Sequence, residues 1–282
     1  MGTRQDIRAL LKAFGITPRD TLGQHFLISE EIAEAIVGDA QLAVADTVLE
    51  IGAGYGALTK HLAPHARQVI AVELDEKLAS IIRQYVGNAE NVSVVRQDIL
   101  RMLTADPAVL REPYHVVANL PYQITSRVVR ELLHREHPPE RATIMVQREV
   151  AERMCAPAGK RSLLSLSIQL GSTPTITRAV PRHHFWPVPN VDSAVVLLAD
   201  CPGSQIRQLS AQRRERLFQL ARIAFSGRRK QLKNTLAAGL TIPSTSIDAA
   251  LRSNGIDPKI RPQDLELEEW LLLANNPLEG GD

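Results

Sequence analysis

The pattern of hydrophobic and polar positions changes along the chain. Between residues 48 and 146, short and nearly continuous apolar runs alternate with segments whose apolar residues recur three and four positions apart. The runs are typical of parallel strands buried on both faces, and the segments of helices that pack on them. This alternation predicts an α/β fold. The expected strands are Thr47–Ile51, Gln68–Glu73, Val92–Arg96, 115–119 and 142–147.

Helical spacing predicts helices at 58–62, 77–85, 125–133 and 149–154, and two further apolar runs predict closing strands of the same sheet at 175–180 and 193–198. After residue 200 only helical periodicity remains. We therefore expect a domain at 1–200, with an amino-terminal arm at 1–28, and a smaller all-α domain at 201–282. Ser210 is the expected cap of a helix there, and one apolar stripe is its expected buried face: Leu217, Leu220, Ala221 and Ala224.

The composition excludes a disordered chain, because 44% of the 282 residues are hydrophobic and 23% are charged. Cys155 and Cys201 lie far apart without paired Cys or His spacing, so neither a disulfide framework nor a metal site is predicted. No apolar run approaches the roughly 18 residues that span a bilayer, and the start lacks a signal-peptide core. A cytoplasmic protein without a membrane partner is the expectation.

Positive charge is concentrated in one part of the second domain. Residues 207–233 hold nine Lys or Arg and one acid, Glu215, whereas the whole chain carries 33 Lys and Arg against 31 Asp and Glu. A solvated helical face is one interpretation. We favour a surface that contacts nucleic-acid phosphates. The residues expected to form it are Arg222, Arg228, Arg229, Lys230 and Lys233.

A glycine turn follows the first expected strand, with Gly52, Gly54 and Gly56 leading into a helix. Glycines at this spacing allow a tight turn and leave room for a ligand against the backbone. The spacing differs from the dinucleotide-binding fingerprint, whose third glycine falls one residue later, where this chain has Ala57. The glycine spacing alone does not exclude a turn with a purely structural role.

Two acids at the ends of the next strands favour a binding function for the turn. Glu73 ends the second strand, where a carboxylate accepts hydrogen bonds from both ribose hydroxyls of a nucleoside. Asp98 follows the third strand and is placed to accept from an adenine amine. Either acid alone is more often a solvated charge. Together with the glycine turn they predict a pocket for an adenosine-containing cofactor, which we interpret as S-adenosylmethionine rather than a nicotinamide cofactor.

The four-residue box Asn119-Leu120-Pro121-Tyr122 follows the fourth expected strand. An exocyclic adenine amine is a poor nucleophile because its lone pair is delocalised into the ring. Hydrogen-bond acceptors aimed at the two amine protons make this lone pair available. We expect the Asn119 side-chain oxygen and the Leu120 carbonyl to be these acceptors. Pro121 would fix the turn and Tyr122 would stack on the base, while Phe185, in a proline-rich loop, would clamp the opposite face.

Several ordered segments resemble the ribosomal RNA adenine dimethyltransferase family. They are the glycine turn, the 119–122 box, Leu-Gly-Gln-His-Phe-Leu at 22–27, Val-Gln-Arg-Glu-Val-Ala at 146–151, Pro-x-Pro-x-Val-Asp-Ser-Ala-Val at 187–195 and Phe-Ser-Gly-Arg-Arg-Lys-Gln-Leu-Lys-Asn-Thr-Leu at 225–236. The resemblance implies a Rossmann-like S-adenosylmethionine-dependent methyltransferase. It implies dimethylation of N6 in two adjacent adenines, in the loop of the 3′-terminal hairpin of small-subunit (16S) rRNA, late in subunit assembly.

The resemblance also implies partners and cofactor contacts. The expected partner is the small ribosomal subunit or its pre-30S precursor, and no DNA partner is expected; a monomer is the default. The implied cofactor contacts are His25, Leu27, Gly52, Glu73, Asp98 and Asn119. Position 25 and position 27 follow from the resemblance alone.

Three departures from the family pattern stand out. Pro18-Arg19-Asp20-Thr21 replaces a basic pair, Arg161-Ser162-Leu163-Leu164-Ser165 replaces a Tyr-Gly-x-Leu-Ser run, and Gly227 replaces a polar residue.

Two alternative functions stay open: a large-subunit (23S) adenine methyltransferase of the macrolide-resistance type, and a factor that mainly docks on ribosome precursors. A DNA adenine methyltransferase is disfavoured because its box usually has a second proline where Leu120 stands.

Overall fold

A computed structural model describes residues 4–18, 24–86, 89–105, 110, 113–227, 230–276 and 278. The chain divides into two compact units. One contains residues 1–152 and 172–202, and the other contains residues 153–171 and 203–282. The second unit therefore includes a segment, 153–171, that the sequence pattern grouped with the sheet.

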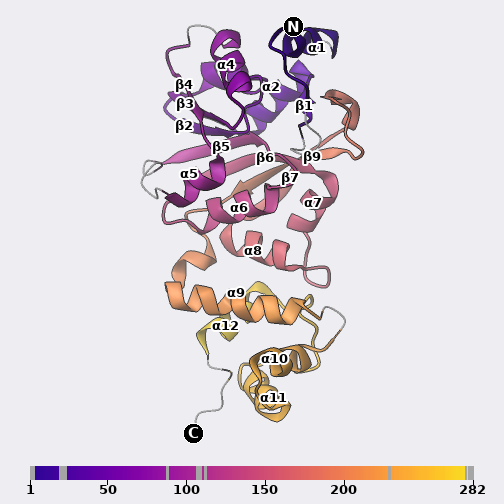
Figure 1. Cartoon of the computed structure of the whole chain (residues 1–282). Helices are drawn as coiled ribbons and strands as arrows, with labels where there is room; N and C mark the ends of the chain where they lie inside the picture. Colours follow the sequence, from indigo (N-terminus) through magenta and orange to yellow (C-terminus); the bar gives the residue numbers. More distant parts are fainter. Residues whose placement is uncertain are drawn as a thin grey trace. The chain divides into compact units, whose positions relative to one another are not determined.

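The first unit is built on a seven-stranded sheet, counted over the described residues, in the order β4-β3-β2-β5-β6-β9-β7 (Figure 1). Strands β2 to β6 are parallel, and β9 lies antiparallel between β6 and β7. The five predicted parallel strands and the two closing strands are confirmed within two residues at each end. The bounds are β2 Thr47–Ile51, β3 Gln68–Glu73, β4 Val92–Arg96, β5 Tyr114–Asn119, β6 Arg141–Gln147, β7 Thr173–Val180 and β9 Ser193–Ala199.

A separate two-stranded ladder joins the amino-terminal arm to the loop before β9. Strand β1 (Phe26–Leu27) pairs antiparallel with β8 (Phe185–Trp186), with Phe26 opposite Trp186 and Leu27 opposite Phe185. The N–H of Ile28 extends this ladder by donating to the His184 carbonyl at 2.9 Å. Two residues carry no periodic signal, so neither strand was predicted from the sequence.

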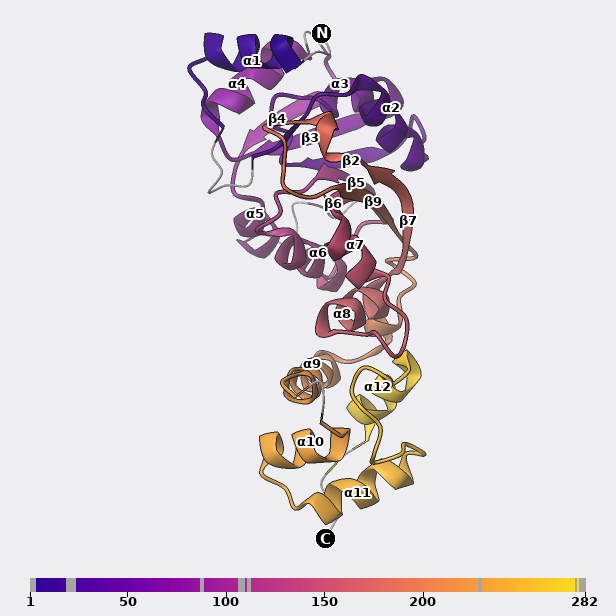
Figure 2. The ribbon, with the colours of Figure 1, turned by 90° about the vertical axis from the view of Figure 1, so that its right-hand side faces the viewer.

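Helices cover both faces of the large sheet (Figures 1 and 2). Apolar residues of α2 and α3 form a core with β2, β3, β5 and β9, and α4 packs on the β3 and β4 side. Helices α5 and α6 lie on the opposite face. The bounds in this unit are α1 Arg4–Ala13, α2 Glu30–Asp39, α3 Thr59–Leu62, α4 Glu76–Tyr85, α5 Ile99–Ala105 and α6 Thr125–His134, with short 3₁₀ turns at Ala63–His65 and Arg182–His184; α7, Arg148–Met154, spans the unit boundary.

The second unit is helical among its described residues: α8 Leu163–Gly171, 3₁₀ turn Gln205–Gln208, α9 Ala211–Phe225, α10 Leu232–Leu240, α11 Ser244–Ser253 and α12 Leu267–Asn275. The Ser210 cap is confirmed, because its side chain accepts the N–H of Arg213. The predicted α9 stripe is buried and packs with Leu166 and Leu170 of α8 and with Trp270. This shared core explains why α8 belongs to the second unit. Over the residues described, no helix has the length and apolar character that a membrane crossing requires.

Two helical glycines differ in the space around them, which predicts opposite stability changes. A Cβ at Gly239 in α10 would clash with Cγ2 of Ile223, whereas a Cβ at Gly38 in α2 would meet no atom of the described residues within 4 Å. Gly38→Ala should stabilise the protein by up to about 1 kcal/mol through helix propensity. Gly239→Ala should destabilise it by about 1–3 kcal/mol through overpacking. Urea unfolding followed by circular dichroism measures both changes. Stabilisation by both alanines would show that Ile223 moves aside at no cost.

Candidate active site

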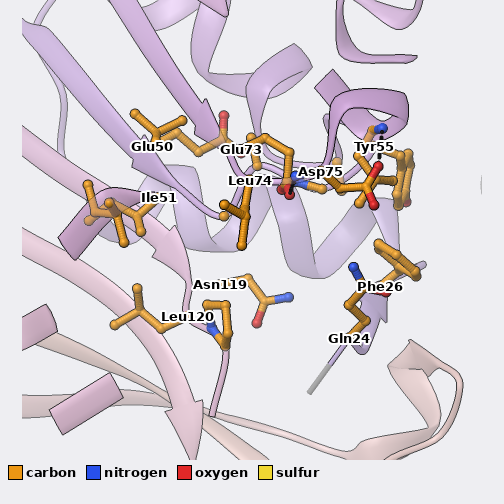
Figure 3. Close-up of a pocket in the computed structure, with 18 of the residues that line it drawn as sticks. Gln24, Phe26, Glu50, Ile51, Tyr55, Glu73, Leu74, Asp75, Asn119 and Leu120 are labelled. Atoms are coloured by element: carbon orange, nitrogen blue, oxygen red, sulfur yellow. Dashed lines mark hydrogen bonds between the residues drawn. The ribbon is translucent and has the colours of Figure 1, made fainter. Parts of the chain in front are cut away.

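The carboxyl ends of four neighbouring parallel strands meet around one cavity of about 580 Å³ (Figure 3). This edge of a parallel α/β sheet is where ligands generally bind. The lining includes residues that follow β2, β3, β4 and β5, together with residues 15–17 and 24–27 of the amino-terminal arm. The volume lies within the range of cavities that hold small molecules.

The glycine turn after β2 adopts a backbone conformation that favours glycine. The φ angles are +69° at Gly52, +61° at Gly54 and +95° at Gly56. A Cβ at Gly52 would lie 3.3 Å from Cδ of Pro121, and one at Gly54 would lie 3.4 Å from the Phe26 ring. The turn therefore packs directly against the 119–122 box on one side and the arm on the other.

Glu73 at the end of β3 fixes the glycine turn from the neighbouring strand. Its Oε2 accepts the N–H of Gly54 at 2.8 Å, and its Oε1 accepts the N–H of Asp75 at 2.9 Å. Burial raises the pKa of this carboxyl, and the backbone donors oppose that rise. A carboxylate offers about four acceptor positions. Glu73 can therefore hold the turn and still accept hydroxyl protons from a ligand in the cavity that it lines.

Asp98 lies after β4 and lines the same cavity, as predicted from the sequence. Its Oδ1 accepts the N–H of Leu100 at 2.8 Å, which anchors the carboxylate at the start of α5. Leu74, directly after Glu73, also lines the cavity although 57% of its surface is exposed. An exposed leucine beside two polar anchors gives the cavity an apolar wall suited to a flat ring.

Glu50 is a second buried carboxyl behind the glycine turn, and sequence reasoning missed it. Only 1% of its surface is exposed, and its Oε2 is a buried oxygen without a hydrogen-bond partner in the described part of the chain. Burial raises its pKa to about 8, with Thr59 opposing the rise and the charge of Glu73 adding to it. Glu50 is therefore mostly protonated at neutral pH.

The 119–122 box is anchored by hydrogen bonds that involve its backbone. The N–H of Leu120 donates to the Met145 carbonyl of β6 at 3.1 Å. The Pro121 carbonyl accepts the N–H of Ile124 at 3.2 Å and the hydroxyl of Thr125 at 3.1 Å. The turn is thereby joined to a central strand on one side and to the first residue of α6 on the other. Its carbonyls hold defined positions before any substrate enters.

The arm sets the orientation of the Asn119 amide. Its Nδ2 donates to the backbone carbonyl of His25 at 3.3 Å, and Figure 3 shows this nitrogen turned toward the arm segment that contains Gln24 and Phe26. Since the amide nitrogen is engaged by the arm, Oδ1 is the atom that remains to accept a proton from a substrate. This arrangement fits the acceptor role predicted for Asn119.

The implied contacts His25 and Leu27 both reach the cavity through the arm. Nδ1 of His25 lies 2.9 Å from the Pro187 carbonyl, so this ring is held by the loop after β8. The Leu27 carbonyl accepts the hydroxyl of Tyr55 at 2.5 Å, while its side chain packs in the core. Sequence reasoning missed Tyr55, although its position between two glycines of the turn was a usable signal.

Tyr122 lines the cavity with a half-buried ring, consistent with the predicted stacking role. Its ring centroid lies 5.6 Å from that of His25 at an interplanar angle of 30°. Its hydroxyl oxygen lies 2.9 Å from Oγ of Ser193, the first residue of β9. Burial raises the Tyr122 pKa, and the Ser193 contact opposes that rise.

Phe185 requires a correction. Its side chain has no exposed surface and belongs to a core cluster with Leu27, Val180 and Val195, and it does not line the cavity. Pairing of β8 with β1 turns this ring inward, so neither face is available to a base. The predicted clamp role is therefore wrong for this conformation.

The basic segment lies in the second unit. Arg222 and Lys230 are exposed, whereas Lys233 is half-buried and pairs with Asp248 at 3.3 Å. The predictions for Arg228 and Arg229 fall outside the described residues, as do those for 19–21. The departure at Gly227 has a local reason, because a Cβ there would lie 2.8 Å from Cγ2 of Thr235.

The sequence matches the family described as ribosomal RNA adenine dimethylase over residues 16–277. The chain belongs to this family. It is 41% identical over 267 residues to ribosomal RNA small subunit methyltransferase A of Dehalococcoides mccartyi strain 195, covering 95% of this chain and 91% of that protein. It is 37% identical over 282 residues to the protein of the same name from Thermobifida fusca, covering 97% and 95%.

Two solved structures share the fold over most of the chain. The 23S rRNA methyltransferase ErmE is 31% identical with a TM-score of 0.68, covering 89% of this chain and 98% of that one. A dimethyladenosine transferase from Plasmodium falciparum is 27% identical with a TM-score of 0.73, covering 88% and 96%. The predicted family and the Rossmann-like methyltransferase fold are thus confirmed.

The buried Glu50 predicts a pH dependence of stability. A carboxyl whose pKa is raised to about 8 in the folded state opposes folding once it must ionise. Its stabilising contribution is full below the ordinary glutamate pKa and is lost as the pH rises toward about 8. Glu50→Gln, which keeps the neutral shape, should gain stability over the wild type across this interval. Urea midpoints at pH 5.5, 7 and 8.5 measure the difference, and a constant difference between the two proteins would contradict it.

Proposed function

We propose that this chain transfers methyl groups from S-adenosylmethionine to N6 of two adjacent adenines in the 3′-terminal hairpin loop of small-subunit rRNA. One observation carries the proposal: the Asn119 amide and the Leu120 backbone, at the end of β5, share a cavity with the glycine turn and Glu73. Acceptors for an amine and anchors for a nucleoside cofactor therefore face the same space.

The residues present fit the cofactor of this family. Glu73 would hold the ribose hydroxyls, Asp98 would accept from the adenine amine, and the backbone of the glycine turn leaves room for the rest. When bound, S-adenosylmethionine supplies an electrophilic methyl group on a positively charged sulfur. The cavity walls formed by the arm at 15–17 and 24–27 would keep water from that group.

The protein's own contribution to the reaction is orientation and electrostatics. Oδ1 of Asn119 and the carbonyl of Leu120 would accept the two amine protons, which directs the nitrogen lone pair outward. The Tyr122 ring would stack on the adenine and keep it in plane. Because the acceptors are held in place before substrate binds, little reorganisation is needed at the moment of transfer.

The finer substrate assignment follows the relatives. The names of two of them contain "small subunit", at 41% and 37% identity over nearly the full chain. The 31% identity to the 23S rRNA methyltransferase ErmE supports the second candidate, a large-subunit adenine methyltransferase. We infer further that the enzyme works in the cytoplasm, as a monomer, on a pre-30S particle, and that the basic residues of the second unit contact rRNA phosphates.

Asn119→Ala should reduce methyl transfer by at least about 100-fold, as expected for loss of a preorganised polar group at the reacting atom. Cofactor binding should weaken only modestly. The assay follows labelled methyl from S-adenosylmethionine into unmethylated small subunits, and calorimetry reports cofactor affinity. Gln84→Ala, which removes an exposed amide from α4, is the control and should retain full activity. Equal transfer by the Asn119 variant and the wild type would exclude the acceptor assignment.

The same assay tests the substrate when large-subunit RNA and DNA are run in parallel and the labelled nucleosides are analysed. Dimethyladenosine only in the small subunit is the expected result. Label in large-subunit RNA would instead favour the second candidate. Cofactor binding without any label would favour a docking factor over an enzyme.

Neutralising Arg228, Arg229 and Lys230 together should weaken binding to small subunits. For each phosphate that the variant no longer neutralises, the slope of log affinity against log salt should fall by about 1. Filter binding at several salt concentrations measures the slope, and catalysis on saturating substrate should change less than affinity. An unchanged slope would place the phosphate-binding surface elsewhere.

A further inference from the structure

Ser193 is a buried hydroxyl residue next to Tyr122, and the proposed reaction assigns it no role. It begins β9, its side chain has no exposed surface, and its Oγ lies 2.9 Å from the Tyr122 hydroxyl. The two residues are 71 positions apart. The contact therefore joins the box after β5 to the strand that follows the proline-rich loop.

The sheet fixes the backbone of Ser193 from both sides. It lies opposite Gln147 of β6 and opposite Val180 of β7 in two antiparallel pairings. The preceding residue, Asp192, accepts the N–H of Arg148 through its carbonyl and the N–H of Arg182 through Oδ1, both at 3.0 Å. The sheet therefore holds the Ser193 hydroxyl at a fixed place.

The Tyr122 ring needs a hydrogen-bond partner at a fixed place because the residue lies in a turn. Pro121 and the start of α6 hold its backbone, but the ring rotates about its own side-chain bonds. The Ser193 contact holds the ring at its far end, and the His25 ring lies beside it with 5.6 Å between centroids. Together they leave Tyr122 in one orientation toward the cavity that it lines.

We propose that Ser193 is a positioning residue for methyl transfer, whose hydroxyl holds the Tyr122 ring where it stacks on the target adenine. This inference rests on the proposed function. Ser193 is not among the residues that line the cavity. Its effect passes through Tyr122, so removing either end of the hydrogen bond should have the same consequence.

Kinetics of four variants test this equivalence. Ser193→Ala and Tyr122→Phe should each lower kcat on small-subunit RNA by about five- to tenfold, the scale of one hydrogen bond, with the KM for S-adenosylmethionine unchanged. The double variant should be no slower than either single one, since both substitutions remove the same hydrogen bond. Ser193→Thr keeps a hydroxyl and should recover most of the activity.

Thr143→Val is the matched control. Thr143 is a fully buried hydroxyl residue of the neighbouring β6, and its Oγ1 has no hydrogen-bond partner in the described part of the chain. Its replacement should leave kcat unchanged, and thermal unfolding should confirm that all variants fold. Wild-type kcat in Ser193→Ala, or effects that multiply in the double variant, would overturn the inference while the proposed function stands.

A measurement without substrate tests the role of Ser193 separately from the proposed function. Tyrosine labelled with ¹³C at Cζ reports each phenol by NMR, and Tyr122→Phe identifies the Tyr122 signal. Because the Ser193 contact opposes the burial that raises the Tyr122 pKa, Ser193→Ala should raise this pKa further and Ser193→Thr should restore it. If the Tyr122 pKa is the same in Ser193→Ala as in the wild type, the inference about Ser193 is overturned. If small subunits are not methylated, that result counts only against the proposed function.

Discussion

The site depends on the close approach of two turns at neighbouring strands. Ile51 at the end of β2 lies opposite Ala118 near the end of β5, so the chain leaves the sheet at the same level on both strands. Gly52 then turns with a positive φ and approaches Pro121 so closely that a Cβ would stand 3.3 Å from the proline ring. A side chain here would be strained and would push the turns apart. Because position 52 has no side chain, the glycine turn and the 119–122 box line the same cavity.

Two buried carboxyls support this junction, and their charges are coupled. Glu73 receives two backbone N–H groups, which compensate an anion, whereas Glu50 has one oxygen without a hydrogen-bond partner in the described part of the chain. Ionising both in a buried region would add repulsion to the cost of desolvation. Burial raises the pKa of both carboxyls, so hydrogen bonding decides between them: Glu50, whose Oε2 lacks a partner among the described residues, holds a proton more readily than Glu73. Glu73 lines the cavity and keeps acceptor positions for hydroxyl protons.

Much of the fold could be predicted from local pattern because buried parallel strands leave nearly continuous apolar runs. The same holds for Gly52, Glu73, Asp98 and the 119–122 box, since the ends of such strands converge at one edge. Other features depend on partners far away in the chain. The assignment of α8 to the second unit rests on the packing of Leu166 and Leu170 with α9 and α12, which helical spacing alone does not reveal. Counting charges likewise missed the pairing of Lys233 with Asp248.

The error at Phe185 shows where local pattern fails in a physical sense. Adjacent residues of a strand point to opposite faces, so one of Phe185 and Trp186 had to face inward. Which one does so depends on register against β1, more than 150 residues earlier in the chain. In the structure Phe185 fills the core, and Trp186 packs with the α1 cluster, where the Arg8 guanidinium lies 5.8 Å from its ring centroid. A shift of one residue in this two-residue ladder would exchange the two aromatic rings, so the arm decides which of them faces the core.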